Sequence, residues 1–128
     1  MAAMSNYLEN ALINATLRNT SYTSPSTVYA ALFTSDPTDA GSGTEVSGGS
    51  YARKAITFGS PSNGVSTNSA AVEFDQATGN WGTITHFGIY DASSSGNLLY
   101  HGALTSSKLI ETGDVFKFAI ASVSVTLS

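Results

Sequence analysis

Residues 83–90 read TITHFGIY, and this stretch decides the fold class. β-Branched and aromatic residues dominate it, as they do in strands. Its period of two predicts a β-strand with Ile84, His86, Gly88 and Tyr90 on one face and residues 83, 85, 87 and 89 on the other. The residues around it extend the same pattern.

Short β-type segments separated by turn residues fill the chain on both sides of this stretch. Strands are predicted at residues 27–34, 51–58, 70–74, 97–104, 108–111, 115–119 and 122–127. Turn signals rich in Ser, Asn and Gly separate them, for example at 60–64 and 93–97. No alternating helix–strand series is present. The pattern therefore predicts a mainly β protein, an antiparallel β-sandwich of jelly-roll or Ig-like type.

A helical apolar stripe occurs only near the N-terminus, at Leu8, Ala11, Leu12 and Ala15. This spacing predicts one short α-helix over residues 5–19, with Asn6 as its cap. The longest predicted loop, residues 35–50, is rich in Gly and Ser. We expect a single globular domain, in which residues 1–24 form a helical arm and residues 25–128 the β-sandwich.

Composition excludes several classes of protein. The 128 residues include five Lys or Arg, nine Asp or Glu and no cysteine, with a net charge of -4. Five scattered basic residues argue against nucleic-acid binding, and the lack of cysteine excludes disulfide scaffolds and thiolate metal sites. Neither a secretory signal nor an apolar run of about 18 residues is apparent. We expect a soluble protein that is made in a cytoplasm and contacts no membrane.

Residues that could carry chemistry are few. His86 and His101 are the only histidines, and Asp91 is the one carboxylate near the end of the His86 strand. A hydrolase would need these groups to converge. We favour two strand histidines that bond to neighbouring backbone or hydroxyl groups, and we expect no catalytic residue and no cofactor.

Acidic residues offer little evidence of a metal site. Asp36, Asp39 and Glu45 in the long loop supply oxygen ligands of the kind that calcium prefers, but their spacing does not match a calcium loop. Asp36-Pro37 is a common turn opener. Arg53 is expected to make one ion pair. We therefore predict a solvated turn at Asp36 and Asp39 and no metal site.

Aromatic residues allow two interpretations. The set comprises Tyr51, Trp81, Phe87, Tyr90 and Tyr100. Together they could form a platform on which sugar rings stack, but aromatics usually fill a sandwich core. We favour the core for the set and expect Trp81, which lies in a Gly-rich turn, to be partly exposed.

Four segments resemble a group of small tailed-bacteriophage virion proteins that are variously labelled minor tail, tail-fibre or head-decoration proteins. The similarity covers residues 6–127. Its most specific pieces are Phe-Thr-x-Asp-Pro at 33–37, Glu-Val-x-Gly-Gly-x-Tyr-Ala-Arg at 45–53 and Trp-Gly-x-Ile-x-His-Phe-Gly-Ile at 81–89. The resemblance implies a virion structural protein without catalytic activity.

Two functions agree with this resemblance. We expect a capsid decoration (cement) protein, a homotrimer on the capsid surface that binds the major capsid protein. The alternative is a tail or tail-fibre component, or a receptor-binding module that contacts host surface glycans. Low charge suits either, because charged residues are depleted in interface cores. Candidate interaction residues are Leu8, Leu12, Asp36, Asp39, Tyr51, Arg53 and Trp81.

Overall fold

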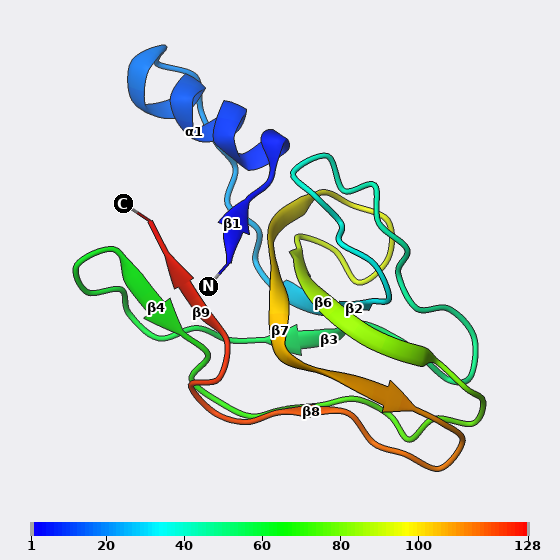
Figure 1. Ribbon diagram of the computed structural model, residues 1–128. Coiled ribbons are helices and arrows are strands. Elements are labelled where there is room, and N and C mark those ends of the chain that lie inside the picture. Colours follow the sequence, from blue (N-terminus) through cyan, green and yellow to red (C-terminus); the bar gives the residue numbers. More distant parts are fainter. Residues whose placement is uncertain (1, 128) are drawn as a thin grey trace.

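The computed structural model describes residues 2–127, which form one helix and nine strands (Figure 1). The elements are β1 (Ala3–Met4), α1 (Asn6–Leu17), β2 (Val28–Phe33), β3 (Lys54–Ile56), β4 (Val65–Thr67), β5 (Val72–Glu73), β6 (Gly82–Tyr90), β7 (Leu98–Ile110), β8 (Lys117–Phe118) and β9 (Ser124–Thr126). All ladders between these strands are antiparallel. The predicted fold class, mainly β with one short N-terminal helix, is confirmed.

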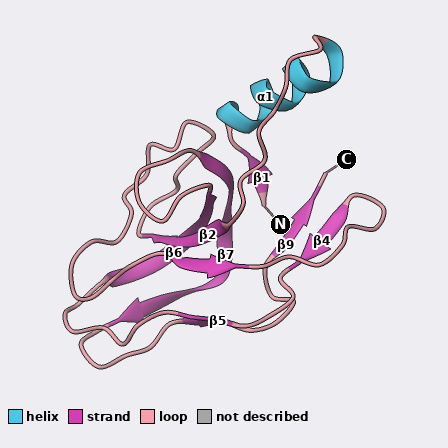
Figure 2. Ribbon diagram, turned by 180° about the vertical axis from the view of Figure 1, so that it is seen from behind, coloured by secondary structure: helices cyan, strands magenta, loops and turns pink. Residues whose placement is uncertain are grey.

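The strands form one large sheet and two small ones. The five-stranded sheet has the order β1-β7-β6-β2-β3, and the two-stranded sheets are β4-β9 and β5-β8. β6 lies at the centre of the large sheet, where His86 pairs with Phe33 of β2 on one side and with Ala103 of β7 on the other. The small sheets lie beside and below it (Figures 1 and 2).

The main core lies between the large sheet and the chain segments that carry the small sheets. Phe87 of β6 contacts Phe118, and Phe118 in turn meets Phe74 and Phe116 edge-on, with ring centroids 5.0–6.2 Å apart. Edge-to-face contacts of this kind add about 0.5–1.5 kcal/mol each beyond the burial of area. An aromatic cluster therefore joins the layers.

The predicted alternation along β6 is wrong at one point. Ile84 does not share a face with His86 but lies in the main core with Phe87. The register explains this difference, because Ile84 pairs with Lys108 whereas His86 pairs with Ala103. Extra residues of β7 therefore form a bulge opposite β6, and a bulge re-aims neighbouring side chains.

Other element boundaries differ from the predictions. Predicted strands 97–104 and 108–111 form the single strand β7, because the bulge at residues 104–107 continues the strand instead of turning it. β3, β5, β8 and β9 are shorter than predicted. The two-residue β1 and the three-residue β4 carry too little periodicity to be predicted.

Helix α1 is joined to the sheet at its first turn. Its cap is Ser5, not Asn6: the Ser5 Oγ accepts a hydrogen bond from the Leu8 N–H (3.2 Å) and donates one to the Leu98 carbonyl. β1, just before it, pairs with β7. Leu8 is the only buried residue of α1, which projects from the body (Figure 1). In the described range, no helix has the length and apolar character to span a membrane.

Replacement of Gly88, at the centre of β6, by any residue with a side chain is predicted to lower stability. A Cβ there would lie 2.9 Å from Leu98 Cδ1 and 3.0 Å from Phe33 Cε1, and both side chains are buried. We expect Gly88→Ala to lower the free energy of unfolding by about 1–3 kcal/mol, as overpacked cores do. Urea denaturation measures this.

Gly59→Ala is the matched control. A Cβ at Gly59 would meet only the Thr67 carbonyl oxygen, at 3.9 Å. We expect its unfolding free energy to stay within about 0.5 kcal/mol of the wild type. Equal effects of the two substitutions would contradict the packing argument.

Candidate functional site

The long loop between β2 and β3 carries most of the predicted site residues. Two groups of side chains tie it to the large sheet. We call Asp36, Asp39, His86 and His101 the His–Asp cluster, and Glu45, Tyr51, Arg53 and Tyr90 the Glu45–Arg53 cluster. The spacing of these residues along the chain did not predict that they would meet.

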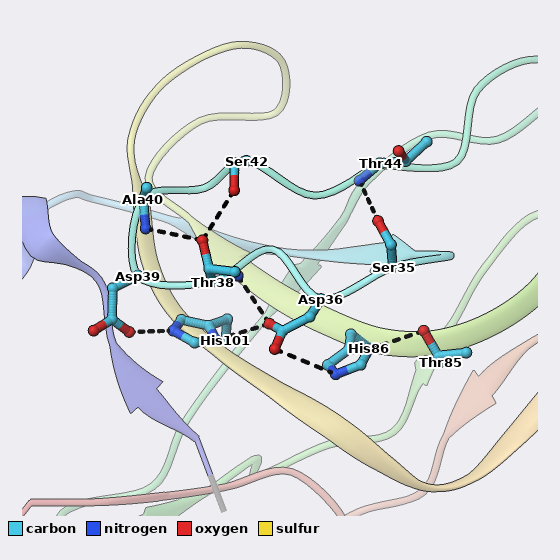
Figure 3. Close-up of polar contacts among 10 residues, drawn as sticks. All are labelled: Ser35, Asp36, Thr38, Asp39, Ala40, Ser42, Thr44, Thr85, His86 and His101. Carbon is cyan, nitrogen blue, oxygen red and sulfur yellow. Dashed lines mark hydrogen bonds and ion pairs between the residues drawn. The ribbon is translucent and has the colours of Figure 1, made fainter.

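The His–Asp cluster joins the first half of the loop to β6 and β7 (Figure 3). Asp39 Oδ1 lies 2.7 Å from His101 Nε2, a hydrogen-bond distance. Asp36 lies between the histidines, with its carboxylate oxygens 4.0 Å from His86 Nε2 and 3.9 Å from His101 Nδ1. Each histidine thus contacts a loop carboxylate. His86 also has the predicted kind of partner, a hydroxyl, since its Nδ1 lies 2.8 Å from Thr85 Oγ1. The partner of His101 is a carboxylate, which was not predicted.

Thr38 turns the loop between the two aspartates. Its φ of 57° lies in the left-handed region, which costs a non-glycine residue about 1–2 kcal/mol. Its N–H donates to Asp36 Oδ1 at 2.8 Å, and its Oγ1 accepts from the Ala40 N–H and lies 3.0 Å from Ser42 Oγ (Figure 3). These bonds offset the strain and hold Asp36 toward the sheet. The predicted turn is therefore present, but its two aspartates contact the histidines of β6 and β7.

The residues considered for a hydrolase do not converge. Asp91 accepts hydrogen bonds from the Asn97 backbone N–H (2.7 Å) and side-chain amide (3.1 Å), within the hairpin between β6 and β7. His86 and His101 contact Asp36 and Asp39 instead. Across residues 2–127, no group of three or more His, Asp or Glu side chains is arranged to hold a metal ion.

The Glu45–Arg53 cluster joins the second half of the loop to the body. Arg53 binds Glu45 through two hydrogen bonds, from Nε to Oε2 (2.9 Å) and from Nη2 to Oε1 (2.8 Å). Its Nη1 donates to the carbonyls of Ala92 and Ser95, and its guanidinium carbon lies 3.7 Å from the centre of the Tyr90 ring. A planar guanidinium with paired donors and a stacking face fits this set of partners. The predicted single ion pair of Arg53 is present within a larger network.

Tyr51 completes this cluster. Its hydroxyl donates to Glu45 Oε2 at 2.7 Å and accepts from the Leu32 N–H at 3.0 Å. Burial, together with the hydrogen bond to the Glu45 carboxylate, raises the pKa of Tyr51 well above its ordinary value. Burial lowers the pKa of Arg53, but the bonds to and charge of Glu45 outweigh that effect and raise it. Both groups keep their protons at neutral pH.

The prediction that Trp81 is partly exposed is wrong. Trp81 is 5% exposed and lies edge-on to Tyr51, and its Nε1–H donates to the Gly49 carbonyl at 2.9 Å. Gly49 has a φ of 57°, and a Cβ there would come within 3.0 Å of Trp81 Nε1. The core interpretation therefore holds for Trp81, because the backbone at Gly49, in the loop between β2 and β3, packs against its indole.

The sugar-stacking platform is likewise absent from the surface that residues 2–127 form. Phe87 and Tyr90 are buried with Trp81, whereas Tyr51 and Tyr100 are only half-buried. Leu8 is buried against the body and Leu12 is half-buried. The exposed apolar residues of α1 are instead Tyr7, Ile13 and Leu17. A helical wheel of all twelve residues, rather than of the most apolar stripe alone, would have indicated these three exposed residues.

These features define a small, mainly β protein in which polar clusters fasten a long loop to a sheet. The chain belongs to the family described as Podophage GP4 fiber I protein gp80, whose model matches residues 3–126. The predicted family of small tailed-phage virion structural proteins is thereby confirmed. No curated protein matches the chain.

Glu45→Ala is predicted to be strongly destabilising. The Arg53 side chain is 8% exposed, so the substitution leaves a buried guanidinium without its carboxylate. We expect the free energy of unfolding to fall by about 3 kcal/mol, as when one partner of a buried pair is removed. Denaturant unfolding of purified protein measures the loss.

Asp75→Ala is the control for this prediction. Asp75 pairs with Lys54 at 2.9 Å, but it is 57% exposed. Its removal should cost less than about 1 kcal/mol. A similar small loss for Glu45→Ala would show that the Glu45–Arg53 cluster does not hold the loop.

The Tyr51 phenol should titrate at a higher pH in the folded protein than in the unfolded chain. The unfolded chain releases the phenol proton near its ordinary pKa of 10.0, whereas the folded protein retains it. The stability linked to this proton is therefore complete below that pH and is lost as the pH rises through the folded pKa. We expect phenolate absorbance to show one fewer late-titrating tyrosine in Tyr51→Phe. An unchanged titration curve would contradict the assignment.

Proposed function

We propose that the protein is a structural subunit of a phage fibre, that it has no catalytic activity, and that helix α1 attaches it to another virion protein. The family match, whose printed description is a fibre protein, supports the first part. The single observation that carries the attachment role is the position of α1, which projects from the body with apolar side chains exposed (Figure 1).

Helix α1 has more apolar surface than its own body covers. Leu8 alone is buried, whereas Tyr7, Ile13 and Leu17 are 43%, 53% and 79% exposed. Ile13 and Leu17 are four residues apart and so share one face of the helix, opposite the side that Leu8 turns to the body. Glu9, four residues before Ile13, lies on the same side of the helix and is the only charged residue within Asn6–Leu17.

A helix of this kind gains stability from a partner. Isolated helices shorter than about 12–15 residues are marginal in water, and α1 has 12 residues. Its first turn is fixed by Ser5, so its free end extends from a defined base. A second protein that covers Ile13 and Leu17 would complete the burial that the body leaves unfinished.

Self-association as a homotrimer remains part of the proposal. Low charge favours close contact between copies, because few ions lose their water. Capsid decoration, with the major capsid protein as the partner of α1, remains a prediction; the same helix would serve in either place. Gold-labelled antibody on intact virions separates the two, since fibres place the label on tails and decoration places it over the head.

Ile13→Glu/Leu17→Glu is expected to block incorporation into virions. Two carboxylates on the docking face would need to be buried, so the amount of protein on purified particles should fall at least tenfold, which corresponds to about 1.4 kcal/mol. Quantitative immunoblotting of particles measures this. Point substitutions are preferable to removal of residues 1–19, because that deletion would also take away β1 and Ser5.

Ser60→Glu/Ser62→Glu is the matched control, since it adds the same charge at two exposed polar positions outside α1. Its level on particles should stay near that of the wild type. Circular dichroism must show that both variants are folded. Normal incorporation of the Ile13→Glu/Leu17→Glu protein would refute the attachment role of α1.

A further inference from the structure

The N-terminal segment, which we define as residues 2–17, is fastened to the body mainly by residues 2–8. Its strand β1 pairs with β7 on one side, and Ala2 bridges to Val125 of β9 on the other (Figures 1 and 2). We call the place between β7 and β9 that β1 occupies the slot. The buried residues of the segment are Ala2, Ser5 and Leu8.

Hydrogen bonds fix the segment where β1 meets α1. The Ser5 N–H donates to the Leu99 carbonyl at 2.9 Å, and the Ser5 Oγ donates to the Leu98 carbonyl. The Asn6 N–H donates to the Asp39 carbonyl at 2.9 Å. All three acceptors belong to the body, so the slot recognises the segment through noncovalent contacts alone. A second copy of the chain presents the same slot and the same segment.

The connection from this segment to β2 is a linker of ten residues, 18–27, which returns from the far end of α1 to the body (Figure 1). All of its residues except Tyr22 and Pro25 are exposed. In the described chain, its hydrogen bonds stay within the linker and the end of α1, for example from the Thr20 N–H to the Asn14 carbonyl (3.1 Å). Ten extended residues span up to about 33–36 Å, so the linker can reach a neighbouring subunit.

We propose that copies of this chain exchange their N-terminal segments, so that residues 2–17 of one copy occupy the slot of the next. The inference deepens the self-association part of the proposed function and rests on it. An exchanged segment makes the same contacts in the new slot as in its own, so exchange sacrifices none of them. Within an oligomer the neighbouring slot is close by, which replaces the effective concentration that the linker provides in a single subunit.

Release of the segment requires little local unfolding. β1 has only two residues and the segment only three buried side chains, so it opens more easily than the large sheet. Segments can therefore leave their own slots while the sheet stays folded. Once exchange is complete, a subunit leaves the oligomer only when two segments are released, its own and the one that it has received. The oligomer should therefore resist dissociation.

Disulfide trapping tests the exchange, because the chain has no cysteine of its own. Met4 and Tyr100 lie opposite each other in the β1–β7 ladder, where Cα atoms are about 4.5–5.5 Å apart and a disulfide can form. Full-length Met4→Cys and Tyr100→Cys proteins should be co-expressed, oxidised with oxidised glutathione and separated without reductant. We expect a covalent dimer with one copy of each, because only an exchanged segment brings the two thiols together. Mass spectrometry of the linked peptides identifies the disulfide.

Thr83→Cys co-expressed with Leu109→Cys is the matched control. These two residues are opposite each other in the β6–β7 ladder and exposed, but both belong to the body, which does not exchange. We expect at least about tenfold more mixed dimer from the first pair than from the control. Ala3→Cys with His101→Cys, the adjacent pair of the β1–β7 ladder, repeats the test if circular dichroism shows that Tyr100→Cys is not folded.

Mixed dimer no more abundant than in the control would overturn the exchange. The double variant Met4→Cys/Tyr100→Cys gives a second measurement, since exchanged segments link its copies into covalent oligomers and segments in their own slots give only monomers. Light scattering of the wild-type protein distinguishes the two failures. An oligomer without mixed dimer contradicts exchange alone, whereas a monomer contradicts self-association itself.

Discussion

The guanidinium of Arg53 is the point at which three separate parts of the chain are held together. It binds Glu45 of the long loop, stacks on Tyr90 of β6 and donates to Ala92 and Ser95 of the hairpin that follows β6. A buried cation must have all its donors satisfied, so these partners have little freedom to rearrange. Glu45 in turn holds Tyr51, whose ring supports Trp81 and Phe74. The loop and the aromatic core therefore depend on one ion pair.

This dependence gives a physical meaning to the Glu-Val-x-Gly-Gly-x-Tyr-Ala-Arg motif. Glu45, Tyr51 and Arg53 are the members of one hydrogen-bonded cluster, and Gly49 supplies the backbone conformation and the space that Trp81 needs. The residues that appeared to be an interaction surface are thus occupied within the molecule. The apolar surface proposed above for a partner lies elsewhere, on α1.

Much of the fold was predictable because period-two patterns are local. β2 and β6 were predicted within a residue or two, and so was the helix. The bulge of β7 was not, because Thr105, Ser106 and Ser107 have the composition of a turn and only pairing with β6 makes them strand. The two clusters could not be predicted either. Asp39 and His101 are 62 residues apart, and nothing in their spacing indicates that the loop crosses β7.

The helix and the small β5–β8 sheet lie toward different ends of the molecule. Helix α1 projects from one end of the molecule, and β5 and β8 lie toward the other (Figures 1 and 2). A partner that covers Ile13 and Leu17 would therefore leave β5 and β8 uncovered. The large sheet between them is held by the Arg53 and aromatic contacts. Attachment through α1, as proposed above, then requires no rearrangement of the sheet, because the helix is joined to the body only at its first turn and at β1.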